Sequence, residues 1–136
     1  MTVENAIQVA IDTLQHSYAP YSKFKVAAAL VAADGTLYKG VNVENASYPA
    51  TNCAERTAFF QAIAEGKREF DYIIIVGGIN GQLSSYCSPC GICRQVMREF
   101  CNPKTFRVII AKSPTDYKEY TLEELLPLSF GPEDLV

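Results

Sequence analysis

The stretch Tyr72-Ile73-Ile74-Ile75-Val76 places four large aliphatic residues in a row near the middle of the chain. Isoleucine and valine are branched at Cβ, which favours extended backbone, and a run without polar interruption is typical of a strand buried on both faces. We therefore predict that 72–76 is the central strand of a sheet. A sheet covered on both faces needs helices on each side, and the flanking sequence should supply them.

Upstream of this strand, apolar residues at helical spacing predict two helices, and two extended segments joined by a turn signal predict a hairpin between them. In chain order, the predicted elements are a helix from Thr2 or Val3 to about His16, strands over 25–32 and 36–42 around the turn Ala33-Asp34-Gly35, and a helix that begins near Cys53 and ends before Gly66.

Downstream, a long loop over 77–88 leads to a third helix, which accepts Pro89 in its first turn because a proline nitrogen needs no hydrogen-bond partner there. The remaining predicted elements are a helix from Cys90 to about Cys101, strands over 106–111 and 117–121, and a short last helix that begins with a Thr121–Glu124 capping box. The link between the last two strands is too short for a parallel crossover, so they should be antiparallel.

The predicted order, α-β-β-α-β-α-β-β-α, describes an α/β fold: a three-layer α-β-α sandwich around a mixed five-stranded sheet. The chain has 136 residues and shows no linker, repeat or low-complexity segment, so we expect a single domain over 1–136.

Composition and charge exclude several classes of function. The net charge is −3 and no basic stripe is present, which argues against binding to nucleic acid. No apolar run approaches the roughly 20 residues of a membrane helix, so no membrane partner is expected. The N-terminus has no basic segment leading into an apolar block, and we therefore expect the protein in the cytoplasm.

Two short motifs carry the chemistry: Cys53-Ala54-Glu55 and Pro89-Cys90-Gly91-Ile92-Cys93. On a helix, Cys90 and Cys93 lie one turn apart and share a face. Thiolates are good ligands for tetrahedral zinc, and a site with only three protein ligands leaves its fourth position to water. The motifs therefore predict a hydrolytic zinc site with Cys53, Cys90 and Cys93 as ligands.

Glu55 is the predicted proton shuttle of this site, because it stands two residues from a ligand. A carboxylate that takes a proton from water and returns it to substrate accelerates a reaction roughly 10²–10⁴-fold. Three thiolates leave the zinc centre anionic, and helix N-termini would restore positive charge. Arg56 could add to this by hydrogen-bonding the sulfurs, although a surface arginine fits the sequence equally well.

Cys87 offers a second register, because Cys87-Ser88-Pro89-Cys90 is also a C-x-x-C motif. With Cys87 as a fourth ligand the site would be closed and structural. We favour three ligands, because Cys87 precedes the helix start and a closed site would leave Glu55 without a task. A redox motif is a weaker alternative, since it leaves Cys53-Ala54-Glu55 unexplained. The fifth cysteine, Cys101, is expected to be a small buried apolar residue.

Asn42 and Glu44 share a face if the returning strand continues that far. An amide and a carboxylate are well suited to hydrogen-bonding sugar hydroxyls, although polar pairs at the start of a loop often have no function. Phe24 precedes the first strand, and base rates favour a core position for it over a pocket wall.

Three segments together resemble the cytidine deaminases of the small homotetrameric, zinc-dependent type. They are Asn42-Val43-Glu44-Asn45-Ala46-Ser47-Tyr48, Cys53-Ala54-Glu55-Arg56-Thr57-Ala58 and Pro89-Cys90-Gly91-Ile92-Cys93-Arg94-Gln95. The resemblance covers nearly the whole chain. It implies one Zn²⁺ per subunit on the three cysteines and a hydrolytic deamination of cytidine and deoxycytidine to uridine and deoxyuridine, as in pyrimidine salvage.

In this mechanism an activated water attacks C4 of the pyrimidine, and Glu55 passes protons to N3 and to the leaving amino group. The resemblance further implies that Phe24 packs on the nucleoside and that Asn42 and Glu44, in the Asn42-Val43-Glu44 strand end, bind ribose hydroxyls. It also implies that backbone groups around Ala54 recognise the base. A homotetramer with shared active sites is implied as well, with Tyr48 and Phe130 completing a neighbouring subunit's pocket.

Some residues depart from the usual family pattern. Ala27-Ala28-Ala29 replaces Gly-Ala-Ala, Ile92 replaces a small alanine, and Ser84-Ser85-Tyr86-Cys87 lengthens the loop before the zinc pair. These changes affect the shape of the pocket, so deamination of another amino-pyrimidine nucleoside, such as blasticidin S, is the nearest alternative. A non-catalytic zinc-stabilised binding module is the alternative from a different class.

Overall fold

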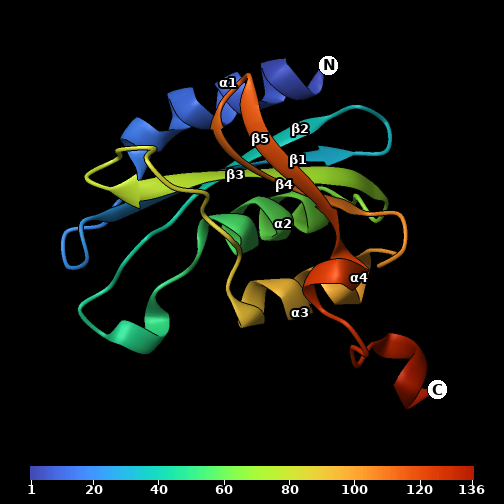
Figure 1. Cartoon of the computed structure of the whole chain (residues 1–136). Coiled ribbons are helices and arrows are strands. Elements are labelled where there is room, and N and C mark those ends of the chain that lie inside the picture. The colour runs from blue at the N-terminus through green and yellow to red at the C-terminus, as the bar shows by residue number, and fades with distance from the viewer.

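The computed structural model describes Met1 to Val136 and contains one five-stranded sheet with helices on both faces (Figure 1). The strand order is β2-β1-β3-β4-β5, so β3 is central. The β3–β4 pair is parallel and the other three pairs are antiparallel. The predicted α/β class and the mixed sheet are confirmed.

The elements follow the predicted order. They are α1 Val3–Thr13, β1 Phe24–Ala32, β2 Leu37–Val41, α2 Ala54–Ala64, β3 Phe70–Ile79, α3 Gly91–Phe100, β4 Arg107–Ser113, β5 Asp116–Thr121 and α4 Leu122–Leu125. Short 3₁₀ turns add Leu14–His16, Tyr48–Ala50 and Pro132–Leu135. Thr121 and Glu124 form the predicted capping box.

The sheet is buried because α1 lies on one face and α2 and α3 lie on the other (Figure 1). Side chains alternate along β3, so Ile74 packs in the α1 layer whereas Ile73 and Ile75 pack in the α2–α3 layer. Burying one such side chain contributes about 1.5–3 kcal/mol. The aliphatic run from Ile73 to Val76 therefore lies in the central strand, as predicted.

The predicted end of this strand at Val76 is wrong. β3 continues through Gly77 and Gly78 to Ile79, which pairs with Phe24 at the start of β1. A Cβ on Gly78 would lie 1.9 Å from the carbonyl oxygen of Gln82, so the glycine allows the following turn to pack directly on the strand. Gly77 and Gly78 were interpreted as the start of a loop, because the local sequence does not reveal the close contact with Gln82.

The first turn of α2 is positioned by a close contact with β2. A Cβ on Gly40 would lie 2.2 Å from the carbonyl oxygen of Ala54 and 2.6 Å from the nitrogen of Ala58. Only glycine therefore permits the helix to approach the strand this closely. Because Cys53 and Glu55 flank Ala54, the same contact determines where these two side chains lie.

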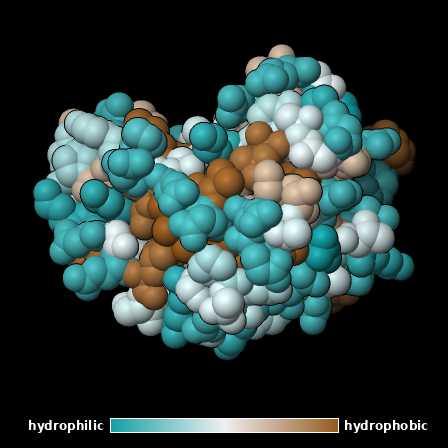
Figure 2. Space-filling view, turned by 90° about the horizontal axis from the view of Figure 1, so that it is seen from above, coloured by the Kyte–Doolittle hydropathy of each residue, from teal (hydrophilic) through white to brown (hydrophobic).

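The surface seen from above, on the side of α1, is mostly hydrophilic, with apolar residues showing in a hollow across its middle (Figure 2). None of the helices combines the length and the apolar character that crossing a membrane would require.

Candidate metal centre and active site

Three cysteines meet where two helices begin. Cys53 is the N-cap residue of α2, Cys90 is the N-cap residue of α3, and Cys93 is buried in the first turn of α3. The two helices begin at the same end of the molecule (Figure 1). Unpaired N–H groups at a helix N-terminus favour negative charge, and the N–H of Cys93 donates to Sγ of Cys90 at 3.5 Å.

The sulfur atoms of these cysteines have the spacing of a zinc site. All three lie within 4.8 Å of one another, and Sγ of Cys53 is 3.9 Å from Sγ of Cys90. Tetrahedral ligands at a Zn–S distance of about 2.3 Å stand about 3.8 Å apart. All five cysteines of the chain are free, so no disulfide competes for these sulfurs. The residues fit a zinc ion with three thiolate ligands.

Two of the sulfurs differ strongly in acidity. A hydrogen bond from Cys93 lowers the pKa of Cys53 despite the opposing effect of burial, and Arg56 lowers it further. The same hydrogen bond raises the pKa of Cys93, which donates it, and burial adds to this rise. Of these two thiols, Cys53 therefore reaches the thiolate form that a metal requires more readily than Cys93.

Arg56 brings positive charge to the sulfur cluster. Its Nη2 donates to Sγ of Cys53 at 3.2 Å, whereas its Nε is buried without a partner. Burial acts to lower the pKa of Arg56, but the hydrogen bonds to the sulfurs of Cys53 and Cys93 outweigh it and raise the pKa. Of the two interpretations that the sequence allowed, the contact with sulfur is the one observed.

Glu55 lies beside the cluster with only 4% of its surface exposed. Burial raises its pKa to about 7, and the negative charge of Cys53 adds to the rise. A carboxyl group with this pKa can both accept and donate a proton near neutral pH. Glu55 takes part in none of the salt bridges of the chain. Its burial beside three sulfurs distinguishes it from an ordinary, solvent-exposed helix glutamate.

Cys87 does not belong to the group of three sulfurs. Its sulfur packs against β3, where a Cβ on Gly77 would lie 3.1 Å from it. Burial raises the pKa of Cys87 to about 12, and the nearby charges of Glu55 and Cys53 add to this effect. Cys87 is thus a neutral thiol close to the site. Cys101 is buried in the core, as expected.

Asn42 is buried and ties the start of β1 to the segment before it. Its Oδ1 accepts from Oγ of Ser17 and from the N–H of Val26, and its Nδ2 donates to the carbonyl oxygen of Phe24 at 2.8 Å. One N–H of the amide remains for another partner. Phe24 is 37% exposed, so it is not the core residue that base rates favoured.

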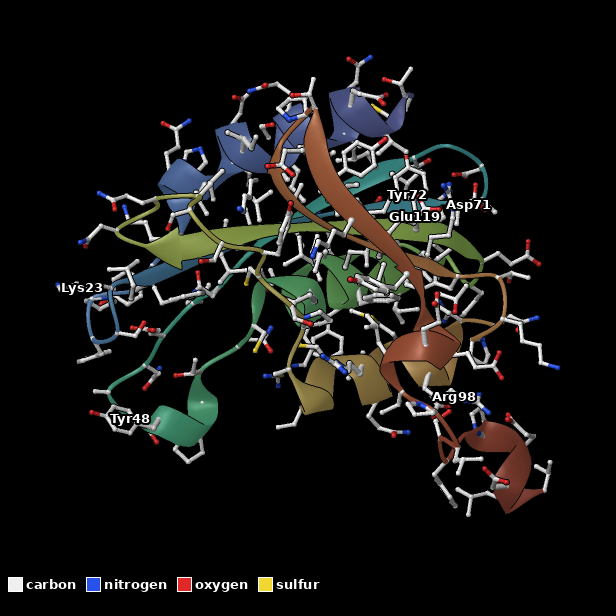
Figure 3. The ribbon with its side chains drawn as sticks, in the orientation of Figure 1. Lys23, Tyr48, Asp71, Tyr72, Arg98 and Glu119 are labelled. Carbon is white, nitrogen blue, oxygen red and sulfur yellow. The ribbon has the colours of Figure 1, made fainter.

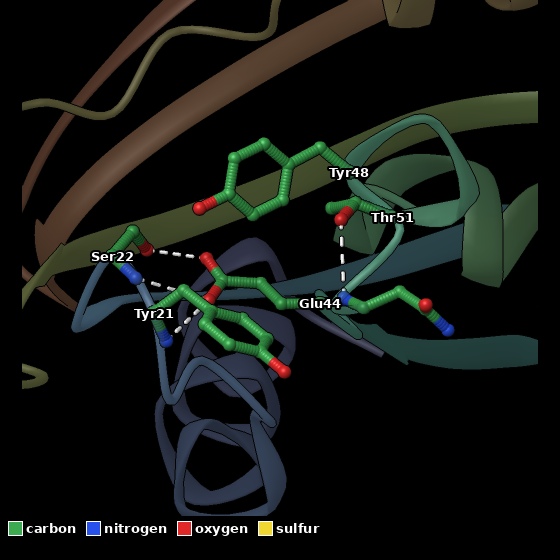
Figure 4. A pocket seen from close by; sticks show the side chains of 6 residues that line it. Tyr21, Ser22, Glu44, Tyr48 and Thr51 are labelled. Carbon is green, nitrogen blue, oxygen red and sulfur yellow. Dashed lines mark hydrogen bonds between the residues drawn. The ribbon is translucent and has the colours of Figure 1, made fainter.

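Glu44 faces a cavity of about 430 Å³ that is also lined by Tyr21, Ser22, Tyr48 and others (Figure 4). Its Oε1 accepts from the backbone N–H groups of Tyr21 and Ser22 at 3.0 and 3.1 Å, and its Oε2 accepts from Oγ of Ser22. The hydroxyl and the N–H of Ser22 lower the pKa of Glu44. Tyr48 is 73% exposed and packs edge-on against Tyr21, with ring centroids 6.1 Å apart.

The remaining candidate residues have different surroundings. Ala54 is fully buried at the start of α2, and Val43 is 44% exposed between backbone bridges to Tyr18 and Asn52. Phe130 lies in the C-terminal segment, where its carbonyl oxygen accepts from Nε2 of Gln95 at 2.8 Å. None of the hydrogen bonds within the chain joins Phe130 to the sulfur cluster, and in Figure 3 this segment and Tyr48 lie at opposite ends of the molecule.

Sequence reasoning missed Ser17 and Ser22, which hold Asn42 and Glu44 in place. Both serines are more than twenty residues away from their partners, in the segment between α1 and β1. A serine in a turn is a common local feature, and only the folded chain reveals which distant carboxylate or amide it contacts.

The fold and the site together define a class: an α/β metalloprotein in which three cysteine thiols are placed to hold zinc and a buried carboxylic acid lies beside them. The family model for the cytidine and deoxycytidylate deaminase zinc-binding region matches residues 1–110. The chain belongs to this family, and zinc is its cofactor.

Individual proteins agree with this assignment. A cytidine deaminase from Sporosarcina psychrophila is 47% identical over 135 residues, which span 99% of this chain and 96% of the relative. A cytidine deaminase from Halalkalibacterium halodurans is 45% identical, over 95% of this chain and 94% of the relative. The crystal structure of cytidine deaminase from Burkholderia pseudomallei superposes with a TM-score of 0.87 at 45% identity, covering 96% of this chain and all of that one.

Proposed function

We propose that this protein catalyses the hydrolytic deamination of cytidine and deoxycytidine, which consumes water and releases ammonia with uridine or deoxyuridine. The observation that carries the proposal is the position of Glu55, a buried acid beside three sulfurs that lie within 4.8 Å of one another. The relatives named above support the choice of substrate. We also propose that residues 1–136 act as one catalytic domain, and that the five free cysteines suit the reducing cytoplasm.

Cys53, Cys90 and Cys93 would hold the metal. Bound there, Zn²⁺ supplies a Lewis acid that lowers the pKa of water at its open position. Glu55 accepts the first proton of the attacking water and delivers it to N3 of the base, and then carries the water's second proton, from the new hydroxyl group on C4, to the departing amino group. Its pKa of about 7 suits both directions of transfer, and its burial keeps bulk water from exchanging the proton.

Arg56 tunes the ligands in this proposal. Its hydrogen bond to Cys53 withdraws negative charge from the sulfur, which keeps the cluster able to polarise water. Replacing Arg56 by alanine should lower zinc affinity about 10–100-fold. Unchanged zinc affinity and unchanged turnover in this variant would contradict the assigned role, and Arg68→Ala, at an arginine outside the cluster, is the control.

The sugar is bound at the ends of β1 and β2. The free N–H of Asn42 and the carboxylate of Glu44 hydrogen-bond ribose hydroxyls, and the exposed ring of Phe24 packs on the nucleoside. Val43 lies between these two polar residues, and backbone groups around the buried Ala54 contact the base.

We further propose a homotetramer in which subunits share active sites. Phe130 is 57% exposed and Tyr48 is 73% exposed, so both aromatic side chains are accessible to a neighbouring subunit. Tyr48 lines the rim of the cavity that Glu44 faces, and Phe130 hydrogen-bonds only Gln95 through its carbonyl oxygen, so each side chain would complete the pocket of a neighbour.

The decisive assay measures ammonia release from a panel of nucleosides, including blasticidin S, alongside zinc stoichiometry. Cytidine and deoxycytidine should be the best substrates, with one zinc per chain. Glu55→Gln should keep the metal and the fold but lose turnover about 10²–10⁴-fold. Full activity in this variant would refute the mechanism, and zinc without turnover of any nucleoside would favour a binding module.

Subunit sharing has its own test. Glu55→Gln and Phe130→Ala proteins are each purified, and then mixed, dissociated and reassembled. In mixed oligomers, some sites combine Glu55 from one chain with Phe130 from another, so activity should rise well above that of either parent. No rise in oligomers of mass-verified mixed composition would show that Phe130 does not act across subunits.

A further inference from the structure

We propose that Tyr86 is a positioning residue, which holds the segment 83–88 against the β4–β5 hairpin and thereby fixes one wall of the nucleoside pocket. The proposal rests on the proposed function, because it assigns Tyr86 a task in nucleoside binding. It concerns the loop Ser84-Ser85-Tyr86-Cys87, which precedes the cysteine pair Cys90 and Cys93 in the chain.

The segment 83–88 takes part in no backbone–backbone hydrogen bond. The last such bond before it runs from Gln82 N to Ile79 O at 3.0 Å, and the next one after it runs from Arg94 N to Cys90 O, also at 3.0 Å. Segments with few backbone hydrogen bonds open most easily. The position of this segment therefore depends on its side chains.

Tyr86 makes three contacts that anchor it to the hairpin. Its hydroxyl donates to Oδ1 of Asp116 at 2.5 Å. The ammonium groups of Lys112 and Lys118 lie 4.5 and 4.6 Å from the centroid of its ring, where a cation is attracted by the electron-rich face. Neither lysine forms an ion pair with a carboxylate, so both are available to the ring.

Both lysines reach the ring from the β4–β5 hairpin, close to a register shift between its two strands. Lys118 is paired with Ile110 and points to the same side of the sheet, whereas Lys112 is the unpaired residue at the register shift between Ala111 and Ser113. Ile110 belongs to the core layer under α2 and α3, on the side of the sheet where the sulfur cluster lies. Tyr86 thus connects the edge of the sheet to the loop that leads into the site.

The contacts of Tyr86 position the wall of the pocket rather than the metal ligands. Tyr86 and Cys87 line a cavity of about 130 Å³ together with Phe24, the proposed nucleoside contact. Cys90, in contrast, is held through α3, because Arg94 donates to the carbonyl oxygen of Pro89 and to Oγ of Ser88, each at 2.9 Å. Loosening Tyr86 should therefore displace Cys87 and the wall opposite Phe24 while zinc stays bound.

The kinetic test compares Tyr86→Leu with Tyr86→Phe in the zinc-loaded, full-length protein. Loss of the ring should raise KM for cytidine about tenfold with kcat within about twofold, because the ground state and the transition state lose the same binding. Tyr86→Phe keeps the ring between the lysines and should stay within about threefold of the parent. The double variant Lys112→Met/Lys118→Met should also raise KM, whereas Lys104→Met, at an exposed lysine elsewhere, should not.

A second readout follows the loop itself. Alkylation of Cys87 by iodoacetamide, monitored by peptide mass spectrometry, should be faster in Tyr86→Leu than in the parent and in Tyr86→Phe. Unchanged KM and unchanged alkylation in Tyr86→Leu would overturn the proposal. So would a lower melting temperature and lower zinc content with unchanged KM, because these would mark a purely structural role.

The two hypotheses fail in different ways. If the parent protein releases ammonia from no nucleoside, the proposed function is wrong, and the proposed role of Tyr86 in nucleoside binding is then wrong as well. If the parent is active but Tyr86→Leu and the double lysine variant behave like the parent, only the role of Tyr86 is refuted.

Discussion

Gly131 lies directly against the guanidinium group of Arg98: a Cβ on Gly131 would stand 2.3 Å from Cζ of that arginine. Arg98 is buried on α3, its Nε donates to Oγ of Ser129 at 2.8 Å, and it forms an ion pair with Glu133. The C-terminal segment therefore wraps around this arginine (Figure 3). Phe130 lies within the wrapped segment and remains exposed.

Gly131→Ala should loosen this contact. The backbone at Gly131 is extended, with φ −142° and ψ 179°, which alanine adopts without strain, so the cost comes from the contact with Arg98 alone. We expect a loss of about 1–3 kcal/mol in the free energy of unfolding, measured by urea denaturation. In an Arg98→Ala background the same change should cost little. Equal costs in both backgrounds would show that the contact is not the cause.

Gly40→Ala should weaken zinc binding from a distance. The new methyl group would meet the backbone of α2 at Ala54 and Ala58, which cannot move aside as a flexible side chain would. We expect a loss of at least about 1–3 kcal/mol in stability and faster loss of zinc to a chelator, because Cys53 moves with the helix. Lys39→Ala, at the exposed neighbouring position, serves as the control and should retain zinc like the parent.

Ser22→Ala should affect nucleoside binding more than turnover. The hydroxyl of Ser22 donates to Glu44 and accepts from the N–H of Phe24 at 3.0 Å, so it joins two proposed nucleoside contacts. Its removal should raise KM about 3–10-fold with little change in kcat. Ser47→Ala removes a hydroxyl that makes no hydrogen bond in the loop before Tyr48, and it should leave KM unchanged. Equal effects of the two variants would argue against the role of Ser22.

The stability of the metal-free protein should fall as pH rises, because burial raises the pKa of Glu55 to about 7. The folded state keeps its proton above the unfolded pKa, which is about 4.3, so the stabilisation is complete below that pH and is lost as pH rises to about 7. The loss amounts to up to about 3 kcal/mol.

Melting temperatures of the chelator-treated protein between pH 4.5 and 8 check this expectation, with Glu55→Gln as the matched control. The difference between parent and variant should change across this range. A constant difference would mean that Glu55 has the same pKa in the folded and unfolded states.

Much of the fold could be predicted because its determinants are local. Four aliphatic residues in a row identified the central strand, and the spacing of apolar residues identified the helices on both sides. The end of β3 was missed because the role of Gly77 and Gly78 depends on Gln82 and on pairing with β1. Such contacts involve residues that no periodic pattern connects.

The candidate site shows the same division. The identity of the three cysteines, of Glu55 and of the zinc chemistry followed from residue types and spacing within two short motifs. The surroundings of Glu44 did not, because its carboxylate is held by backbone and side-chain groups some twenty residues earlier in the chain.

The order of helices and strands and the residues that can bind metal could be predicted from the amino-acid sequence, because hydrophobic periodicity, helix capping and ligand chemistry act over a few neighbouring positions. The folded chain was needed to show that three sulfurs and not four come together, that Arg56 contacts them, and that Tyr86 contacts the β4–β5 hairpin. These arrangements depend on how separate elements pack against one sheet, and such packing brings together residues that are distant in the chain.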